Sequence, residues 1–214
     1  MLFYLVLKNT LRDVLMYKIT LSLFFSFFIL SCSSSNKKVE PYVASNFYSE
    51  EFHDISLDNY YISQINQIRL KGGPCSENPA PPVRFNKYLK DAASAHAKDM
   101  ALHKQITHSG SGTTTDIAKR NGSNSSFIDR ILFVGYPATQ YDLLGETVAK
   151  TKFKELKKKK SKKQHFKLAL KKLLKDPYHC KILTNPRFKD VGVGVAKGED
   201  GYYWVINLGE TTPY

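Results

Sequence analysis

The sequence is poor in cysteine, with only three among its 214 residues. Its main apolar run, residues 19–30, spans 12 apolar or small residues, which is too short for a comfortable transmembrane helix. Acidic residues are also scarce, because 19 Asp and Glu stand against 32 Lys and Arg and leave a net charge of +13. The odd number of cysteines leaves one of them without an internal partner. The length allows one domain with tails.

The positive charge is concentrated in one stretch. Between Lys150 and Lys172, twelve lysines stand against one glutamate, so this stretch alone carries +11 and the rest of the chain is close to neutral. No nucleic-acid partner is expected, because the stretch lacks a groove-reading helix and offers few stacking aromatics. It is either a solvated loop or a basic patch that attracts anionic envelope polymers or lipid headgroups. The patch residues are Lys157, Lys158, Lys159, Lys160, Lys162 and Lys163.

The N-terminal region, residues 1–31, resembles a lipoprotein signal peptide. Lys18 precedes the apolar run, and Ile29-Leu30-Ser31-Cys32 resembles a lipobox. The mature protein would begin at an acylated Cys32 and be held on a membrane through its acyl chains. A simple secretory signal and an uncleaved anchor are the alternatives.

Two further boundaries follow from this interpretation. Translation is hypothesised to start at Met16, because residues 1–17 are unusually long and apolar for a charged leader. Residues 32–57 are interpreted as a polar tether and residues 58–214 as the folded domain, with a lysine-rich insertion at 150–172. The expected location is the extracytoplasmic side of the cell envelope.

Periodicity places four helices and a hairpin in the domain. The helices begin at a capping Asp58, at a capping Asn86, at Ser125 or Ser126, and within the lysine-rich stretch, where the last ends at Asp176-Pro177. Residues 191–209 read as a hairpin, in which Gly192 and Gly194 let another backbone approach closely. This order suits an α+β fold in which helices cover both faces of a sheet.

A short segment between two prolines, residues 177–186, connects the last helix to the hairpin. It is read as one or two ordered turns, because the prolines leave too little chain for a full helix. Within it His179 stands directly before Cys180. The remaining pieces are expected to meet this segment.

These motifs, in this order, resemble the CAP superfamily of cysteine-rich secretory, antigen 5 and pathogenesis-related proteins, and especially its bacterial SCP-like branch. The resemblance covers about residues 59–210 and implies an α-β-α sandwich with a small central antiparallel sheet. The matching residues are Ile65-Asn66-Gln67-Ile68-Arg69, Asn86-Lys87-Tyr88-Leu89, His96-Ala97-Lys98-Asp99-Met100-Ala101, His108-Ser109-Gly110, Gly135-Tyr136, Gly145-Glu146, Pro177-Tyr178-His179-Cys180, Gly192-Val193-Gly194, Tyr203-Trp204 and Leu208-Gly209.

The resemblance also implies a cleft built from two histidines and two acids. His108, Glu146 and His179 match three of these positions, whereas neither Glu155 nor Asp176 is a clear counterpart of the fourth. His108 and His179 are therefore candidate ligands for zinc or another divalent cation, bound weakly. The alternative is a buried His-Glu network that only fixes the loops.

The other histidines and the cysteines have simpler interpretations. His96 is expected to pack within its helix, and His103 and His165 to lie on the surface. No nucleophile constellation is present, since neither Ser109 nor Cys180 belongs to a recognisable triad. Cys75 and Cys180 form the natural disulfide outside the cytoplasm.

Three functions are consistent with this sequence. The favoured one is a non-catalytic, envelope-anchored module that binds a lipid, a glycan or a protein. The second is a metal-assisted hydrolase, such as a peptidase, that uses His108, Glu146 and His179 around a metal-bound water. The third is a surface protein for host interaction or stress whose cleft is vestigial. Fold alone does not choose among them.

Overall fold

The computed structural model describes residues 54–76, 78–121, 123–156 and 161–210. The proposed signal, Cys32, the tether and Lys157, Lys158, Lys159 and Lys160 lie outside these ranges. Within them are the helices α2 (Ile55–Leu70), α3 (Lys87–His103), α4 (Phe127–Phe133), α5 (Lys162–Lys175) and α6 (Pro177–Thr184) and a 3-10 turn, η2 (Phe153–Glu155). The strands are β1 (Arg84–Phe85), β2 (Leu144–Lys152), β3 (Asp190–Lys197) and β4 (Gly201–Gly209).

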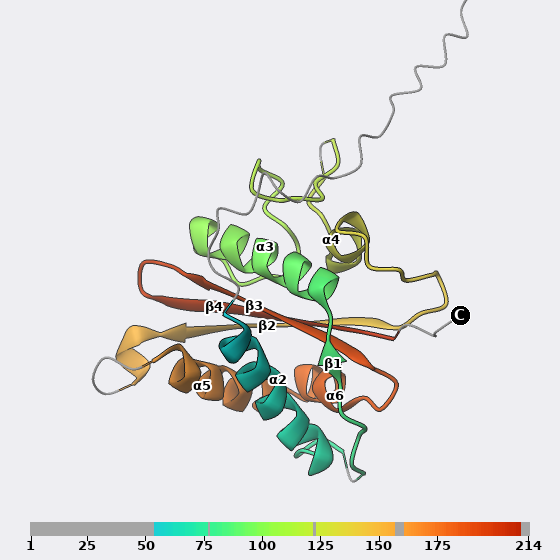
Figure 1. Ribbon diagram of the computed structural model, residues 1–214. Coiled ribbons are helices and arrows are strands. Elements are labelled where there is room, and N and C mark those ends of the chain that lie inside the picture. The colour runs from blue at the N-terminus through green and yellow to red at the C-terminus, as the bar shows by residue number, and fades with distance from the viewer. Residues whose placement is uncertain (1–53, 77, 122, 157–160, 211–214) are drawn as a thin grey trace, which may run out of the picture. The chain divides into compact units, whose positions relative to one another are not determined.

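The four strands form one sheet in the order β1-β3-β4-β2, with helices on both faces (Figure 1). Helices α3 and α4 lie on one face, and α2, α5 and α6 lie on the other. Strands β2, β3 and β4 pair antiparallel, whereas β1 pairs parallel with β3. The α+β sandwich is as predicted, but the sheet is mixed rather than antiparallel. Strand β1 leads directly into α3, and its partner β3 comes much later in the chain. No hairpin joins the two strands, so they can run parallel.

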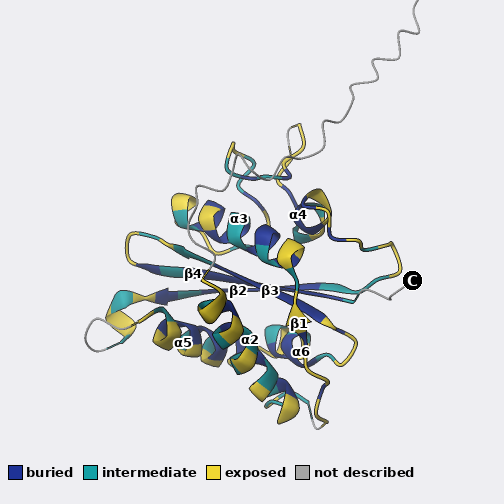
Figure 2. Ribbon diagram, viewed as in Figure 1, coloured by how far each residue is buried: buried dark blue, intermediate teal, exposed yellow. Residues whose placement is uncertain are grey.

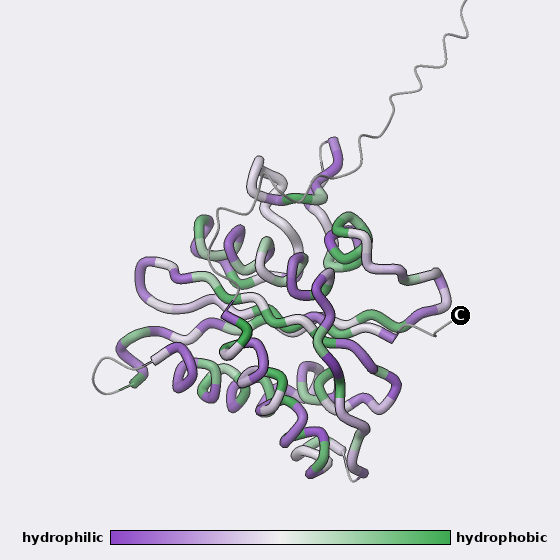
Figure 3. The backbone as a smooth tube through the Cα atoms, in the orientation of Figure 1, coloured by the Kyte–Doolittle hydropathy of each residue, from purple (hydrophilic) through white to green (hydrophobic). Residues whose placement is uncertain are grey.

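The face covered by α2, α5 and α6 holds the larger hydrophobic core. Side chains alternate along β4, so Trp204 and Ile206 point into this core while Tyr203 and Val205 point to the opposite face. Figure 2 shows buried residues on the strands and on the helix sides turned toward them. Figure 3 shows the same pattern in hydropathy, with alternating apolar and polar segments along the helices.

On the other face, α3 lies very close to the sheet. A Cβ on Gly192 would stand 2.0 Å from the Lys90 nitrogen, and one on Gly194 would stand 2.2 Å from the Ala93 carbonyl carbon. The two glycines therefore leave room for the helix backbone, as predicted from their alternation with valine. Near Gly194 the helix residues are small, namely Ala93 and Ser94, and Ala93 is fully buried.

The helix ends differ from prediction in two places. Helix α2 begins at Ile55 rather than after Asp58, because the Asp54 side chain accepts hydrogen bonds from the Ser56 and Leu57 nitrogens. The segment after Asp176 is an eight-residue helix, α6, rather than a turn. Pro177 occupies its first turn, where no backbone donor is needed, and so starts this helix. The predicted caps of α3 and α4, Asn86 and Ser126, are confirmed.

The prediction that His165 lies on the surface is wrong. His165 is only 2% exposed, and its Nδ1 lies 3.2 Å from Thr151 Oγ1 beneath Phe153 and Tyr202. Tyr202 and Tyr203 of β4 face opposite sides of the sheet, and neither is exposed, because helices cover both faces. Within the described ranges, no helix has the length and apolar character that a membrane span requires.

Candidate functional site

The candidate cleft is formed where three distant segments meet. His108 comes from the loop after α3, Glu146 is the third residue of β2, and His179 lies in the first turn of α6. His108 Nδ1 lies 2.9 Å from Glu146 Oε1, and His108 Nε2 lies 3.3 Å from His179 Nε2. The structure thus brings together the three side chains singled out in the sequence.

The two imidazoles are reachable from solvent, whereas the acid is not. The side chain of His108 is 47% exposed and that of His179 is 19% exposed, but that of Glu146 is 0% exposed. Because a carboxylate only accepts, His108 Nδ1 donates its proton to Glu146 in this contact. The other ring nitrogen, Nε2, faces His179.

His179 is held by the start of α6. Asp176 caps this helix and accepts hydrogen bonds from the Tyr178 and His179 nitrogens, the latter at 2.9 Å. Its Oδ1 also lies 3.6 Å from His179 Nδ1, so Asp176 is the acid nearest to this ring on its far side. Burial lowers the pKa of His179 below its ordinary value, which favours the neutral imidazole at neutral pH.

Beneath the imidazoles, Arg130 of α4 forms a buried ion pair with Glu146. Arg130 Nη2 donates to Glu146 Oε2 at 3.1 Å and to Oε1 at 3.2 Å, and the arginine side chain is only 1% exposed. The same nitrogen donates to the backbone carbonyl of His108 at 2.8 Å. Arg130 therefore fixes both the acid that orients His108 and the backbone that carries it. The sequence analysis missed it, although a charged residue on the apolar side of a short helix is a usable signal.

Two more side chains complete this support. Asn207 of β4, with its amide turned to satisfy its neighbours, donates Nδ2–H to Glu146 Oε2 at 3.2 Å. His96 is 1% exposed, as predicted, and its Nε2 lies 2.7 Å from the carbonyl of Thr107, next to His108. Glu146 is thus contacted by Arg130, His108 and Asn207, which leaves neither of its oxygens without a donor.

The disulfide between Cys75 and Cys180 is present, with a Cα–Cα distance of 6.0 Å across a sequence separation of 105 residues. It joins the turn after α2 to α6, one residue beyond His179. Of the remaining sequence candidates, His103 is partly exposed and contacts Thr113 and Thr115 outside the cleft. Lys162 and Lys163 lie in the first turn of α5, also away from the cleft.

The imidazole pair fits a divalent cation, but as a sparse donor set. Zinc–nitrogen bonds of about 2.0–2.1 Å at a tetrahedral angle place two nitrogens roughly 3.3–3.4 Å apart, close to the observed separation. However, the described residues contain no group of three or more His, Cys, Asp or Glu that could hold a metal. The arrangement supports weak, exchangeable coordination by His108 and His179.

Comparisons with solved structures identify similar folds. An outer surface protein from Borrelia burgdorferi superposes with a TM-score of 0.50 at 18% identity, covering 72% of this chain and 92% of its own. An extracellular protein containing an SCP domain from Bacillus anthracis gives 0.48 at 21% identity and 72% coverage, and this chain spans only 42% of its length. The venom allergen-like protein 4 of Schistosoma mansoni gives 0.38 at 14% identity, covering 72% of this chain and 86% of its own.

Sequence comparison identifies the family directly. None of the curated protein sequences matches the chain. The profile of the CAP, or cysteine-rich secretory protein, family matches residues 62–208, which is more than half of the chain and reaches from within α2 to within β4. The chain belongs to the CAP, or cysteine-rich secretory protein, family.

Proposed function

We propose that this protein is a non-catalytic binding module of the cell envelope, held on a membrane by an acylated Cys32. The observation that carries the non-catalytic assignment is the burial of Glu146, whose side chain is 0% exposed and whose oxygens accept from Arg130, His108 and Asn207. A general base must reach the proton that it removes within hydrogen-bond distance, directly or through one water. Glu146 is shielded from solvent and its oxygens already accept from protein donors.

The open side presents two imidazoles, those of His108 and His179, and little else that could react. They can hold a ligand directly or through a weakly bound divalent cation. His108 and His179 would coordinate this cation, and the cation would act as a Lewis acid. Catalytic zinc sites in proteins generally have three protein ligands and an open position, which is one ligand more than this cleft provides. Binding without turnover is the function that this donor set supports best.

Isothermal titration of the metal-free, full-length protein with zinc chloride tests the role of the cleft. Weak binding should be lost in His108→Ala and in His179→Ala and retained in His103→Ala, which removes an imidazole outside the cleft. Equal affinity in all four proteins would contradict the assignment of His108 and His179. Peptide and ester substrates at saturating zinc should show no turnover above that of His179→Ala.

A metal-assisted hydrolase is the second candidate, favoured by the 3.3 Å spacing of the two Nε2 atoms. In that case His108 and His179 would hold the metal, and Glu146 would keep His108 in the required tautomer. Turnover that disappears in folded His179→Ala would select this candidate over the binding module.

The envelope location has its own support. The apolar run at residues 19–30 ends at Ser31-Cys32, and the Borrelia burgdorferi protein with the same fold is named an outer surface protein. Labelling of cells with a fatty acid should mark the protein, and Cys32→Ser should remove the label and release the domain from the membrane. Label that persists in Cys32→Ser would contradict acylation at this residue.

A further inference from the structure

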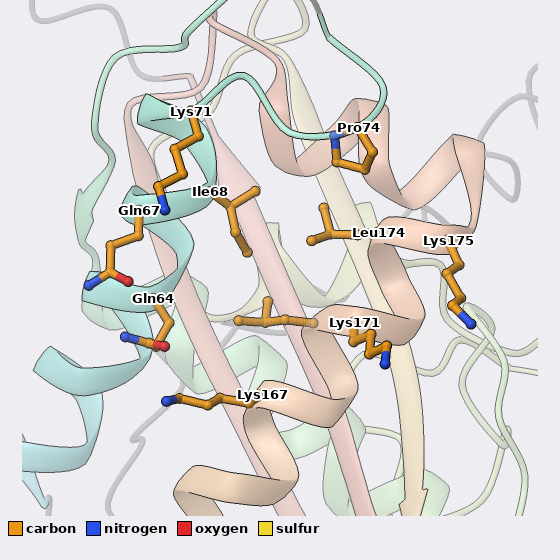
Figure 4. A pocket seen from close by; sticks show the side chains of 10 residues that line it. Gln64, Gln67, Ile68, Lys71, Pro74, Lys167, Lys171, Leu174 and Lys175 are labelled. Atoms are coloured by element: carbon orange, nitrogen blue, oxygen red, sulfur yellow. The ribbon is translucent and has the colours of Figure 1, made fainter.

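A second candidate site lies apart from the histidine cleft, between α2 and α5. It is an open groove of about 600 Å³. Ile68 of α2 and Leu174 of α5 point toward each other across it (Figure 4), and Leu170 also lines it. None of its lining residues belongs to the cleft formed by His108, Glu146 and His179.

The rim of the groove carries four exposed lysines: Lys71 at the end of α2, and Lys167, Lys171 and Lys175 on α5. On an α-helix, residues four apart are separated by about 6 Å along the axis, so the α5 lysines form a regular row of positive charge. A row of this kind complements a linear chain that carries repeated negative groups.

No carboxylate of the described residues pairs with these four lysines, although they lie together along one groove. By contrast, Lys172, on the same helix, lies 2.7 Å from Glu155, and Lys150 lies 2.7 Å from Asp200. The positive charge of the groove is therefore uncompensated within the part of the chain that the structure describes. An anionic ligand would meet it without first displacing an internal partner.

The rest of the lining favours a hydrated chain with hydroxyl groups. Gln64 and Gln67 on the α2 side supply amide donors and acceptors. Ile68, Leu170 and Leu174 form an aliphatic floor, which offers a narrow apolar strip for the C–H faces of sugar rings. An acyl chain needs a site that encloses most of its surface, which an open groove does not provide. A flat membrane would meet the lysine tips but not the recessed Ile68 and Leu170.

We propose that the groove between α2 and α5 binds a linear anionic polysaccharide, with its acidic groups along the α5 lysines and its sugar faces on the aliphatic floor. This inference rests on the proposed role as a binding module and names a ligand class for it. It is independent of the metal chemistry of the histidine cleft.

The test measures binding of the full-length protein in detergent to dextran sulfate, with neutral dextran as the uncharged reference. Dextran sulfate should bind and neutral dextran should not. Lys167→Gln/Lys171→Gln should bind dextran sulfate about 30-fold more weakly at low salt, since each lysine near an anionic surface contributes roughly a factor of five. The matched control is Lys98→Gln/Lys119→Gln, which removes the same charge from exposed lysines of α3 and the loop before α4 and should bind like wild type. Circular dichroism of both variants should be unchanged.

Two further arms separate this ligand from other anions. Gln64→Ala/Gln67→Ala should weaken binding to dextran sulfate but not to inorganic polyphosphate, which has no sugar to contact. Equal losses in the two lysine variants, an unaffected Gln64→Ala/Gln67→Ala variant, or binding only to phosphatidylglycerol vesicles would each overturn the proposal. Zinc binding should be unchanged in all of these variants, so failure of the groove proposal and failure of the histidine cleft would be told apart.

Discussion

Replacing Arg130 with methionine removes the cation beneath Glu146 while keeping an unbranched side chain in α4. The guanidinium group contacts both oxygens of Glu146, the His108 carbonyl, and the carbonyl and hydroxyl of Ser125. Since Glu146 has a fully buried side chain, its charge would remain without a cationic partner. Breaking a buried pair in this way costs about 3–5 kcal/mol of the free energy of unfolding.

For a chain of this size, that loss lowers the midpoint of thermal unfolding by roughly 6–20 °C. Urea denaturation followed by circular dichroism measures the free energy directly. The matched control is Arg120→Met, which breaks the ion pair of Arg120 with Asp129 at 2.7 Å, where the arginine side chain is 78% exposed. That change should cost about 1 kcal/mol or less.

A double variant, Arg130→Met/Glu146→Gln, should recover part of the loss, because it leaves no unpaired charge. Equal costs for Arg130→Met and Arg120→Met would refute the reasoning, since they would mean that burial of the Glu146 pair has no energetic consequence. A double variant no more stable than Arg130→Met would show instead that the hydrogen bonds to Ser125 and His108 dominate.

Three other predictions concern the scaffold. Reducing the Cys75–Cys180 bridge, which closes a loop of about 100 residues, should lower the free energy of unfolding by up to about 4.7 kcal/mol; an unchanged urea midpoint with reductant would contradict it. Burial lowers the pKa of His96 and His165 below 6.5, so the unfolded chain takes up protons first and stability should fall as the pH drops from about 6.5 toward 5. Equal urea midpoints at pH 7.5 and 5 would exclude this linkage. Gly194→Ala places a methyl group 2.2 Å from the backbone of Ala93 and should lower the free energy of unfolding by about 3 kcal/mol or more in the same assay. The control Ala196→Gly, on the same strand, should lower it less. The reverse order would argue against the close approach of α3.

Local patterns in the sequence predicted much of this fold. The caps Asn86 and Ser126, the stop at Asp176-Pro177 and the alternation in residues 191–209 depend on nearby residues, and the structure confirms each of them. The structure also confirms the pairing of Cys75 with Cys180. This pairing could be predicted because few alternatives remain once Cys32 is assigned to the signal. What these features share is that their cause lies within a few residues or in a simple count.

The wrong or missing predictions concern features that depend on contacts between residues far apart in the sequence. His165 was expected on the surface, yet its position on α5 turns it toward Thr151, Phe153 and Tyr202. The parallel pairing of β1 was missed because only two residues of that strand meet β3. Arg130 was missed because its partner Glu146 comes from another element, and its place on the apolar side of the short helix α4 was the only local signal.

In α6, neighbouring residues have separate tasks: His179 completes the imidazole pair and Cys180 ties the helix to the turn after α2. A newly made chain in a reducing compartment would carry its second imidazole on a helix without this tie. We therefore expect the cleft to bind its ligand fully only after the Cys75–Cys180 bond has formed, which requires an oxidising compartment.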